Sequence, residues 1–281
     1  MSIEATSSPS ALPTVAVIGG GVIGGTLITA MKVAGWPGES ITVANRGEAK
    51  REALVQAHAI KATGDNREAV AGAQAVVLAV KPQQMADVLE EIASAVEPGA
   101  LVLTVAAALP ASFYEERLAG GTPVIRIMPN TPSVVGRGAT SVSPGAHATE
   151  EHLLVAEAML RATGLVVRVP EELIEAVTVV AGSAPAFFYA FTEALTEAGV
   201  MQGLERDLAA LLAQQTFAGA AQLLAESGET PQELRRRVSS PGGVTLAALE
   251  AMTDAGLQGV VSAGARAAVA RTREMSAQLA G

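Results

Sequence analysis

Residues 14–31 read T-V-A-V-I-G-G-G-V-I-G-G-T-L-I-T-A-M, and this stretch decides the fold of the N-terminal part of the chain. Its apolar run stops at Gly19, and Gly19, Gly21 and Gly24 follow the spacing G-x-G-x-x-G before an apolar helical pattern begins. Because glycine lacks a Cβ, the backbone can turn sharply and approach a ligand, and the first N–H groups of the helix suit a pyrophosphate. The stretch therefore predicts a strand, a tight turn and a helix that bind a dinucleotide.

Two other interpretations of the same residues stay open at this point. Glycine-rich turns are common, so the pattern alone is weak and also fits a plain β-turn. No charged residue falls within 14–31, which is also a property of membrane helices. The glycines disfavour that alternative, since each costs about 1 kcal/mol of helix propensity and the run barely reaches the roughly 18 residues a span needs.

The length of 281 residues suggests one large or two ordinary domains, and two domains are expected. Aromatic residues make up only 3%, so the interior must be built from Ala, Val, Leu and Ile. The net charge of -9 disfavours nucleic acid and anionic membranes as partners, and the absence of cysteine excludes disulfides and thiolate metal sites. Residues 1–12 lack the pattern of a signal peptide and are predicted to be a disordered lead, which makes the cytoplasm the expected location; no metal is expected.

The residues after the glycine turn supply the context that the motif needs. Residues 22–34 read as a helix and 41–44 as a second strand, which together make a βαβ unit. An NAD-selective protein would carry Asp or Glu after that strand, but here Asn45 and Arg46 follow Ala44. Both side chains can donate to a 2′-phosphate, so NADP is favoured over NAD; an Arg46 that is simply exposed to solvent is the alternative.

Further apolar strands are expected at 75–80, 101–105, 124–128, 139–142 and 164–169, with a helix at 149–162. Continuous apolar runs are typical of a parallel sheet that is covered on both faces, and ligands lie at the carboxyl ends of such strands. Lys81 stands at one of these ends, where it either meets a cofactor phosphate or ribose or is a helix-start lysine of no consequence.

From Glu171 the pattern becomes helical, with expected segments at 171–180, 185–200, 206–226 and 245–278. Residues 176–192 carry no charge, which predicts a helix buried all round, with a break at 182–185. We infer that a second subunit covers it. The predicted fold is an α/β Rossmann-type NADP-binding domain at 13–170 followed by an all-α dimerisation and substrate domain at 171–281.

Residues 239–245, S-S-P-G-G-V-T, form a second glycine turn between two predicted helices. Two hydroxyls, a glycine pair and the free N–H groups of the following helix make a suitable receptor for a carboxylate. An ordinary loop in which Thr245 caps the next helix is the alternative.

With these residues in place, the sequence resembles the pyrroline-5-carboxylate reductase family over nearly the whole chain. The most specific marks are Ala79-Val80-Lys81-Pro82, residues 126–132 (R-I-M-P-N-T-P), residues 182–186 (G-S-A-P-A) and the turn at 239–245. The resemblance implies a Rossmann domain, a helical domain that forms an intertwined homodimer, and assembly of dimers up to decamers. It also implies NADPH as the hydride donor, with NADH as an alternative donor, and 1-pyrroline-5-carboxylate as the substrate.

The resemblance carries two sets of site residues to this chain. The implied cofactor contacts are Gly19, Gly21, Val22, Ile23, Gly24, Asn45, Arg46, Asn66, Ala79, Val80, Lys81, Pro82, Ala106 and Ala107. The implied substrate contacts are Ser240, Gly243, Val244 and Thr245, with Thr245 bonded to the ring nitrogen. Two positions depart from the family pattern: Ala108 stands where glycine is usual, and Arg237 where some relatives have an asparagine that touches the cofactor.

The implied reaction moves a hydride from C4 of NADPH to C5 of the cyclic imine and gives L-proline, the last step of proline biosynthesis. A protonated imine is already a strong electrophile, so orientation supplies much of the catalysis and Thr245 is the one catalytic candidate. His58, His147 and His152 are expected at the surface or in helix caps. One alternative is another NADP-linked imine or β-hydroxyacid reductase, but β-hydroxyacid chemistry normally needs a lysine or histidine acid in the helical domain, and the chain has neither after Glu171. The other alternative is a non-catalytic NADP-binding regulator, which the intact second glycine turn disfavours.

Overall fold

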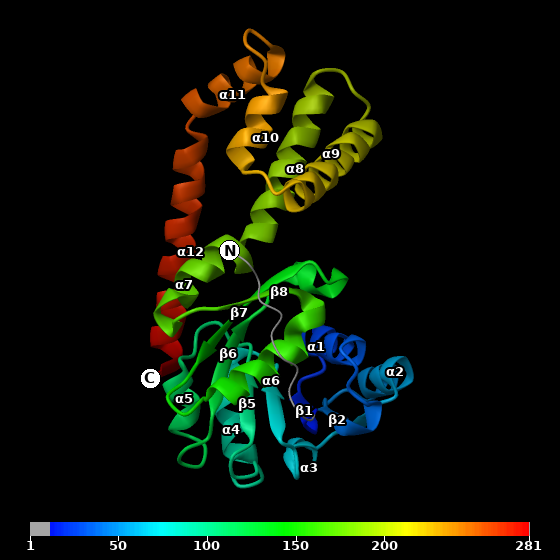
Figure 1. Ribbon diagram of the computed structural model, residues 1–281, viewed down its shortest axis with the longest axis vertical. Helices are drawn as coiled ribbons and strands as arrows, with labels where there is room; N and C mark the ends of the chain where they lie inside the picture. The colour runs from blue at the N-terminus through cyan, green and yellow to red at the C-terminus, as the bar shows by residue number, and fades with distance from the viewer. Residues whose placement is uncertain (1–11, 281) are drawn as a thin grey trace. The chain divides into compact units, whose positions relative to one another are not determined.

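The computed structural model describes residues 12–280, so most of the predicted lead at 1–12 lies outside the described residues. The chain divides into two compact units (Figure 1). The first contains the described residues up to Ser183 together with those from Val269 onward, and the second is Ala184–Ala268.

The first unit is built on an eight-stranded sheet in the order β3-β2-β1-β4-β5-β6-β7-β8. All neighbouring strands are parallel except the antiparallel pair β6 and β7. The strands are β1 Val15–Ile18, β2 Ile41–Ala44, β3 Lys61–Thr63, β4 Ala75–Leu78, β5 Leu101–Thr104, β6 Val124–Met128, β7 Gly138–Pro144 and β8 Gly164–Arg168. The predicted Rossmann-type sheet is confirmed, and the first stretch is a buried strand and a helix rather than a membrane span.

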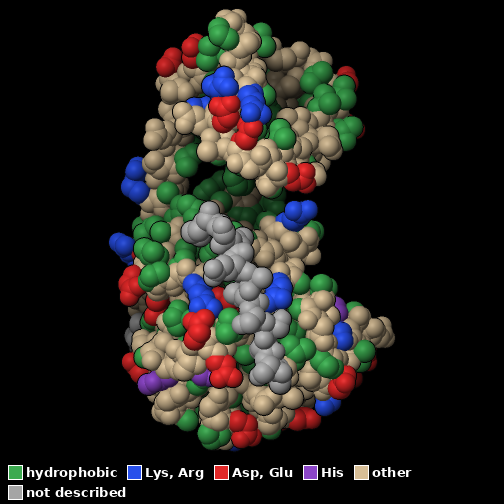
Figure 2. Space-filling model, viewed as in Figure 1, with side chains coloured by type: hydrophobic (Ala, Val, Ile, Leu, Met, Phe, Trp, Pro, Cys, Tyr) green, Lys and Arg blue, Asp and Glu red, His purple; other side chains and the backbone are tan. Residues whose placement is uncertain are grey.

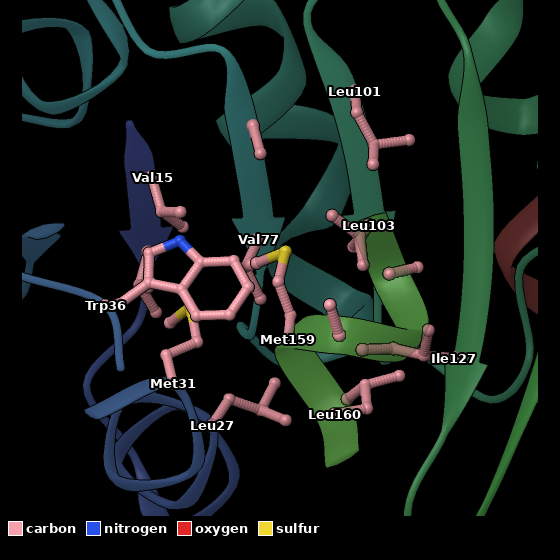
Figure 3. Packing of buried hydrophobic residues seen from close by; sticks show 14 of the residues in the cluster. Val15, Leu27, Met31, Trp36, Val77, Leu101, Leu103, Ile127, Met159 and Leu160 are labelled. Atoms are coloured by element: carbon pink, nitrogen blue, oxygen red, sulfur yellow. The ribbon is translucent and has the colours of Figure 1, made fainter. Parts of the chain in front are cut away.

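Helices cover both faces of this sheet, as the uninterrupted apolar strands require (Figure 1). On one face α1 (Val22–Val33) and α6 (Glu150–Leu160) pack around Trp36 and Met159 (Figure 3). On the other face lie α3 (Asn66–Val70), α4 (Met85–Ile92) and α5 (Ala111–Glu115). The sequence patterns did not predict these three helices, nor α2 (Glu48–His58) and β3.

Short 3-10 helices connect several of these elements. They are η1 Gly38–Ser40, η2 Pro82–Gln84, η3 Thr131–Val135, η4 Arg161–Thr163 and η5 Glu171–Leu173. Helix α7 (Ile174–Val177) continues into a π-helical turn, η6, at Thr178–Gly182, where the Ser183 N–H donates to the Thr178 carbonyl at 2.7 Å. The predicted interruption near 182–185 is therefore confirmed, and its form is a π-helical turn.

The second unit consists of α8 (Ala184–Met201), α9 (Arg206–Ser227), α10 (Pro231–Val238), α11 (Val244–Asp254) and the first half of α12 (Leu257–Ala280). The single helix predicted at 245–278 is wrong. Gly256 adopts a left-handed φ of 87°, and this ends the helical hydrogen-bond pattern between α11 and α12. The second half of α12 belongs to the first unit, where Arg273 pairs with Glu175 at 2.8 Å.

Large apolar side chains are exposed along the helices of the second unit (Figure 2). Within the single chain, the helical residues 176–192 are not buried: Val180 is 75% exposed and Tyr189 is 55% exposed. The burial of this segment by a second subunit stays a prediction. Two helical stretches, Glu171–Met201 and Arg206–Ser227, are long and apolar enough to cross a membrane by length and composition. That is weak evidence for a membrane, because the core helix of a soluble protein can pass the same test of length and composition.

Candidate functional site

The glycine turn after β1 has the close contacts that make glycine necessary. Gly19 has φ 102°, and a Cβ there would lie 2.6 Å from the carbonyl oxygen of Ala79. A Cβ on Gly24 would lie 2.0 Å from the carbonyl oxygen of Gly19. At Gly21, by contrast, an added Cβ would meet no atom within 4 Å. Gly19 thus lets the turn approach the residue that follows β4, and Gly24 lets α1 pack closely against the turn after β1. Gly21 leaves open space for a ligand.

A cavity of about 340 Å³ lies at the carboxyl ends of β1, β2 and β4. It is lined by Ile18, Gly19, Gly21, Ala44, Asn45, Arg46, Asn66, Ala79, Val80, Lys81, Gln84, Asp87, Val88 and Glu91. Helix α1 begins at Val22 with Gly21 as its N-cap and no side-chain cap, so its first N–H groups are available to an anion. The open space at Gly21 and these N–H groups fit the pyrophosphate of a dinucleotide.

Eight of the predicted cofactor residues line this cavity, including Asn66, which only the family resemblance implied. Val22 lines a different hollow, on the side of α1 that faces Val134 and Val135. Ile23, Gly24, Pro82, Ala106 and Ala107 line neither hollow. For Gly24 the reason is its buried contact with the turn itself.

Asn45 and Arg46 have different surroundings at the end of β2. The Asn45 Oδ1 accepts the Gly20 N–H at 3.2 Å, and its Nδ2 donates to the Gly47 carbonyl at 3.2 Å, so this side chain braces the glycine turn. Arg46 is exposed, and it has no carboxylate partner among residues 12–280. Of these two side chains, Arg46 is therefore the one whose charge is available to an anion.

One wall of the cavity was missed from the sequence. This wall consists of Gln84, the N-cap of α4, and Asp87, Val88 and Glu91 of that helix. Glu91 Oε2 accepts a hydrogen bond from Asn66 Nδ2 at 2.8 Å. Their spacing of i, i+3, i+4 and i+7 after the end of β4 predicts residues on one side of a helix, and this pattern could have identified the wall from the sequence.

The loop after β5, which contains Ala106 and Ala107, is restrained by a hydrogen bond from Arg126 of β6. Arg126 Nη2 donates to the Ala107 carbonyl at 2.8 Å, and the Thr104 hydroxyl donates to the phenol oxygen of buried Tyr114 at 2.7 Å. Burial raises the pKa of Tyr114 to about 12, so the phenol stays neutral. Ala108 is buried, and Ala59 alone among the described non-glycine residues has a positive φ, so alanine at 108 meets no backbone strain.

The second glycine turn lies in the helical unit. Gly242 has φ 70°, and the Gly243 N–H donates to the Ser240 carbonyl at 2.9 Å. A Cβ on Gly243 would lie 2.5 Å from the Ser240 hydroxyl, which can rotate away, and 3.0 Å from the Ser240 carbonyl oxygen, so the backbone turn is tight at this position. Gly243 is the N-cap of α11, and the alternative in which Thr245 caps that helix is wrong. The N–H groups of Val244 and Thr245 at the uncapped start of α11 can receive a carboxylate.

The remaining polar candidates have structural partners. Arg237, which stands where some relatives have asparagine, pairs with Glu229 and Glu233. His152 completes the capping box of α6 with Thr149, and His58 lies 3.4 Å from the Thr29 hydroxyl. Within residues 12–280 no group of three His, Cys, Asp or Glu side chains could hold a metal ion.

Together, a glycine turn against a parallel sheet, an uncapped helix start and an arginine in place of the ribose carboxylate define an NADP-linked oxidoreductase of the Rossmann type. A family model described as NADP oxidoreductase, coenzyme F420-dependent, matches residues 14–108, and one described as pyrroline-5-carboxylate reductase dimerisation matches residues 171–275. The chain belongs to the pyrroline-5-carboxylate reductase family, as the following relatives show.

A pyrroline-5-carboxylate reductase of Corynebacterium melassecola is 39% identical over 267 residues, which are 94% of this chain and 99% of that protein. One of Pseudomonas aeruginosa is 38% identical and covers 95% of this chain and 98% of its own length. The solved structure of a pyrroline-5-carboxylate reductase from Coxiella burnetii has a TM-score of 0.89 at 34% identity, with 95% of this chain and 99% of that chain covered. A Plasmodium falciparum pyrroline carboxylate reductase with NADP bound shares the fold, with a TM-score of 0.83 at 23% identity over 96% of this chain and all of that one.

Proposed function

We propose that this protein reduces 1-pyrroline-5-carboxylate to L-proline with NADPH, the last step of proline biosynthesis in the cytoplasm. The observation that carries the proposal is the pair of intact glycine turns in a chain that matches pyrroline-5-carboxylate reductases over nearly their whole length. The first turn offers the pyrophosphate site beside Gly21, and the second offers uncapped N–H groups at Val244 and Thr245.

The first set of roles concerns the cofactor, which supplies a hydride when bound. The N–H groups at the start of α1 hold the pyrophosphate, and Arg46 meets the 2′-phosphate. Lys81 and Asn66 line the same cavity and can bond ribose or phosphate oxygens. The loop of Ala106 and Ala107, held by Arg126, places small apolar side chains on the nicotinamide side of the cofactor.

The second set of roles concerns the substrate. The N–H groups of Val244 and Thr245, with the Ser240 hydroxyl, hold the substrate carboxylate near Gly243. The Thr245 hydroxyl bonds the ring nitrogen and so fixes which face of C5 is presented. The iminium nitrogen takes up the electron pair of the C=N bond when C5 is reduced, so no metal or strong acid is needed; correct placement alone can supply several kcal/mol.

The assembly belongs to the same proposal. We infer that residues 13–170 act as the NADP-binding domain and 171–281 as the dimerisation and substrate domain, and that a second copy, rather than lipid, covers the exposed apolar faces of α8 and α9. Assembly of dimers up to decamers is part of this inference. Light scattering on the purified protein, without detergent, measures it directly.

A coupled pair of measurements tests the function. Loss of NADPH absorbance is followed with 1-pyrroline-5-carboxylate, and L-proline is identified among the products by mass spectrometry. We expect proline to form in a one-to-one ratio with NADPH consumed, and slower turnover with NADH. Tight NADPH binding without turnover would instead support the non-catalytic regulator, and turnover of a β-hydroxyacid alone would support the other class of reductase.

A further inference from the structure

Arg51, a residue of α2, contacts the two residues that follow β2. Its Nη1 donates to the carbonyl oxygens of Asn45, at 2.8 Å, and Arg46, at 3.0 Å. A Cβ on Gly64 would lie 3.5 Å from the same nitrogen. The guanidinium of this α2 residue therefore lies between the end of β2 and Gly64, the residue that follows β3. It restrains the backbone at Asn45 and Arg46 through their carbonyl oxygens.

The charges around this point favour an anion. Neither Arg46 nor Arg51 forms an ion pair with a carboxylate in the part of the chain that the structure describes, although the net charge of the protein is -9. Helix α2 begins beside them with Gly47 as an N-cap that contributes no side-chain acceptor. The carboxylates around this region are Glu48 in the first turn of α2, Asp65 after Gly64, and Asp87 and Glu91 on the cavity wall. Asp65 caps α3 by accepting the N–H groups of Arg67 and Glu68, and Glu91 accepts a hydrogen bond from Asn66.

We propose that Arg51 is a positioning residue that sets the preference of this enzyme for a nucleotide with a 2′-phosphate. This inference rests on the proposed use of NADPH. By binding two carbonyl oxygens, the guanidinium offsets their negative partial charge beside the anion and restrains the backbone from which the Arg46 side chain extends. It also adds a second positive charge close to the 2′-phosphate, which an adenosine ribose without that phosphate does not use.

Calorimetric binding of two small nucleotides tests the proposal without any turnover. Adenosine 2′,5′-bisphosphate carries the 2′-phosphate, and 5′-AMP lacks it. In Arg51→Gln we expect affinity for the bisphosphate to fall about 10-fold, the size of one charged hydrogen-bond set, while affinity for 5′-AMP stays within about twofold. Lys50→Gln is the matched control, because it removes one charge from the same helix turn without touching the carbonyls, and it should change both affinities by less than about twofold.

Equal losses for the two nucleotides in Arg51→Gln would overturn the proposal, since they would mean that Arg51 only supports the fold of the site. An unchanged affinity for the bisphosphate would overturn it as well. If Arg51→Gln does not fold, Arg51→Lys replaces it in the test. The lysine ammonium cannot reproduce the planar guanidinium, so the ratio of bisphosphate affinity to 5′-AMP affinity must fall by about threefold or more.

The outcome is separable from that of the proposed function. If wild-type protein fails to reduce 1-pyrroline-5-carboxylate but Arg51→Gln loses binding of the bisphosphate selectively, the reductase proposal fails and the role of Arg51 stands. If turnover is observed and Arg51→Gln leaves the ratio of NADPH to NADH kcat/KM unchanged, the reductase proposal stands and the role of Arg51 fails.

Discussion

Arg126 Nη1 lies 2.6 Å from Glu171 Oε1, and this ion pair joins strand β6 to the first residue of the segment that matches the dimerisation family. The two side chains are 9% and 30% exposed. The same Glu171 oxygen accepts the Ala111 N–H at 2.8 Å, and Arg126 also holds the Ala107 carbonyl. One ion pair thus connects the loop after β5 to the start of the segment that matches the dimerisation family.

Removing one partner of this pair should destabilise the protein. Arg126→Met leaves Glu171 without its cation, and we expect the free energy of unfolding to fall by about 3 kcal/mol. Glu171→Gln keeps an acceptor for the Ala111 N–H, and we expect about 1 kcal/mol. Urea unfolding monitored by circular dichroism measures both. Equal small losses in the two single variants, with simple additivity in the double variant, would show that the pair is not coupled.

The glycine turn allows a matched comparison of two adjacent positions. Gly24→Ala would place a Cβ 2.0 Å from the Gly19 carbonyl oxygen, which cannot be relieved without moving α1 from β1. We expect it to weaken NADPH binding at least about 100-fold, since misplaced donors lose most of their binding energy. Gly25→Ala would meet only the Leu54 side chain at 3.8 Å and should bind NADPH as the wild type does. Fluorescence titration with NADPH compares them, and equal behaviour of the two would contradict the packing argument.

Thr245 should matter for the reaction rather than for folding. Thr245→Ala is expected to lower kcat/KM for 1-pyrroline-5-carboxylate by roughly 10- to 1,000-fold, the range from one hydrogen bond to one general acid. The melting temperature and the affinity for NADPH should be unchanged. Thr253→Ala, which removes only a bond to the Leu249 carbonyl on the same helix, is the control. Normal steady-state kinetics for Thr245→Ala would remove this residue from the mechanism.

A charge placed on the helical surface should dissociate the dimer. Leu211 on α9 is 64% exposed in the single chain, and Leu211→Glu would place a charge in the proposed apolar interface. We expect a shift from dimer or larger oligomer toward monomer in light scattering at micromolar concentration. Val55→Glu introduces the same charge on α2, where the side chain is 38% exposed, and should leave the mass unchanged. A wild-type protein that is monomeric would end this proposal.

Buried Tyr114 predicts a loss of stability at alkaline pH. Burial raises the pKa of its phenol to about 12, whereas the unfolded chain has a value near 10. The folded state therefore retains a proton that the unfolded state releases, so this stabilisation is present below about pH 10 and is lost as pH rises from about 10 to 12, by up to about 2–3 kcal/mol. Tyr114→Phe should flatten this decline. Urea midpoints at several alkaline pH values compare the two proteins, and parallel curves would contradict the assignment.

Local patterns in the sequence predicted the elements that local physics controls. Strand β2 was predicted with the bounds that the structure has, and β1 and α1 within a residue, because an apolar run that ends at glycine limits the backbone wherever it occurs. The break between α11 and α12 was missed, since a glycine inside a helical pattern ends a helix only when the surrounding chain favours its left-handed conformation.

The tertiary structure alone decided which side chains meet in the site. Sequence patterns placed Asn45 and Arg46 together as donors, but only the fold turned Asn45 toward Gly20 and left Arg46 exposed. Asn66 meets Glu91, and Arg126 meets Glu171, because the order of the strands brings together residues that are far apart in the chain. What the sequence by itself determined is the glycine turn and its strand and helix, since steric limits act locally; the long-range pairs depend on how the sheet is assembled, which no local pattern encodes.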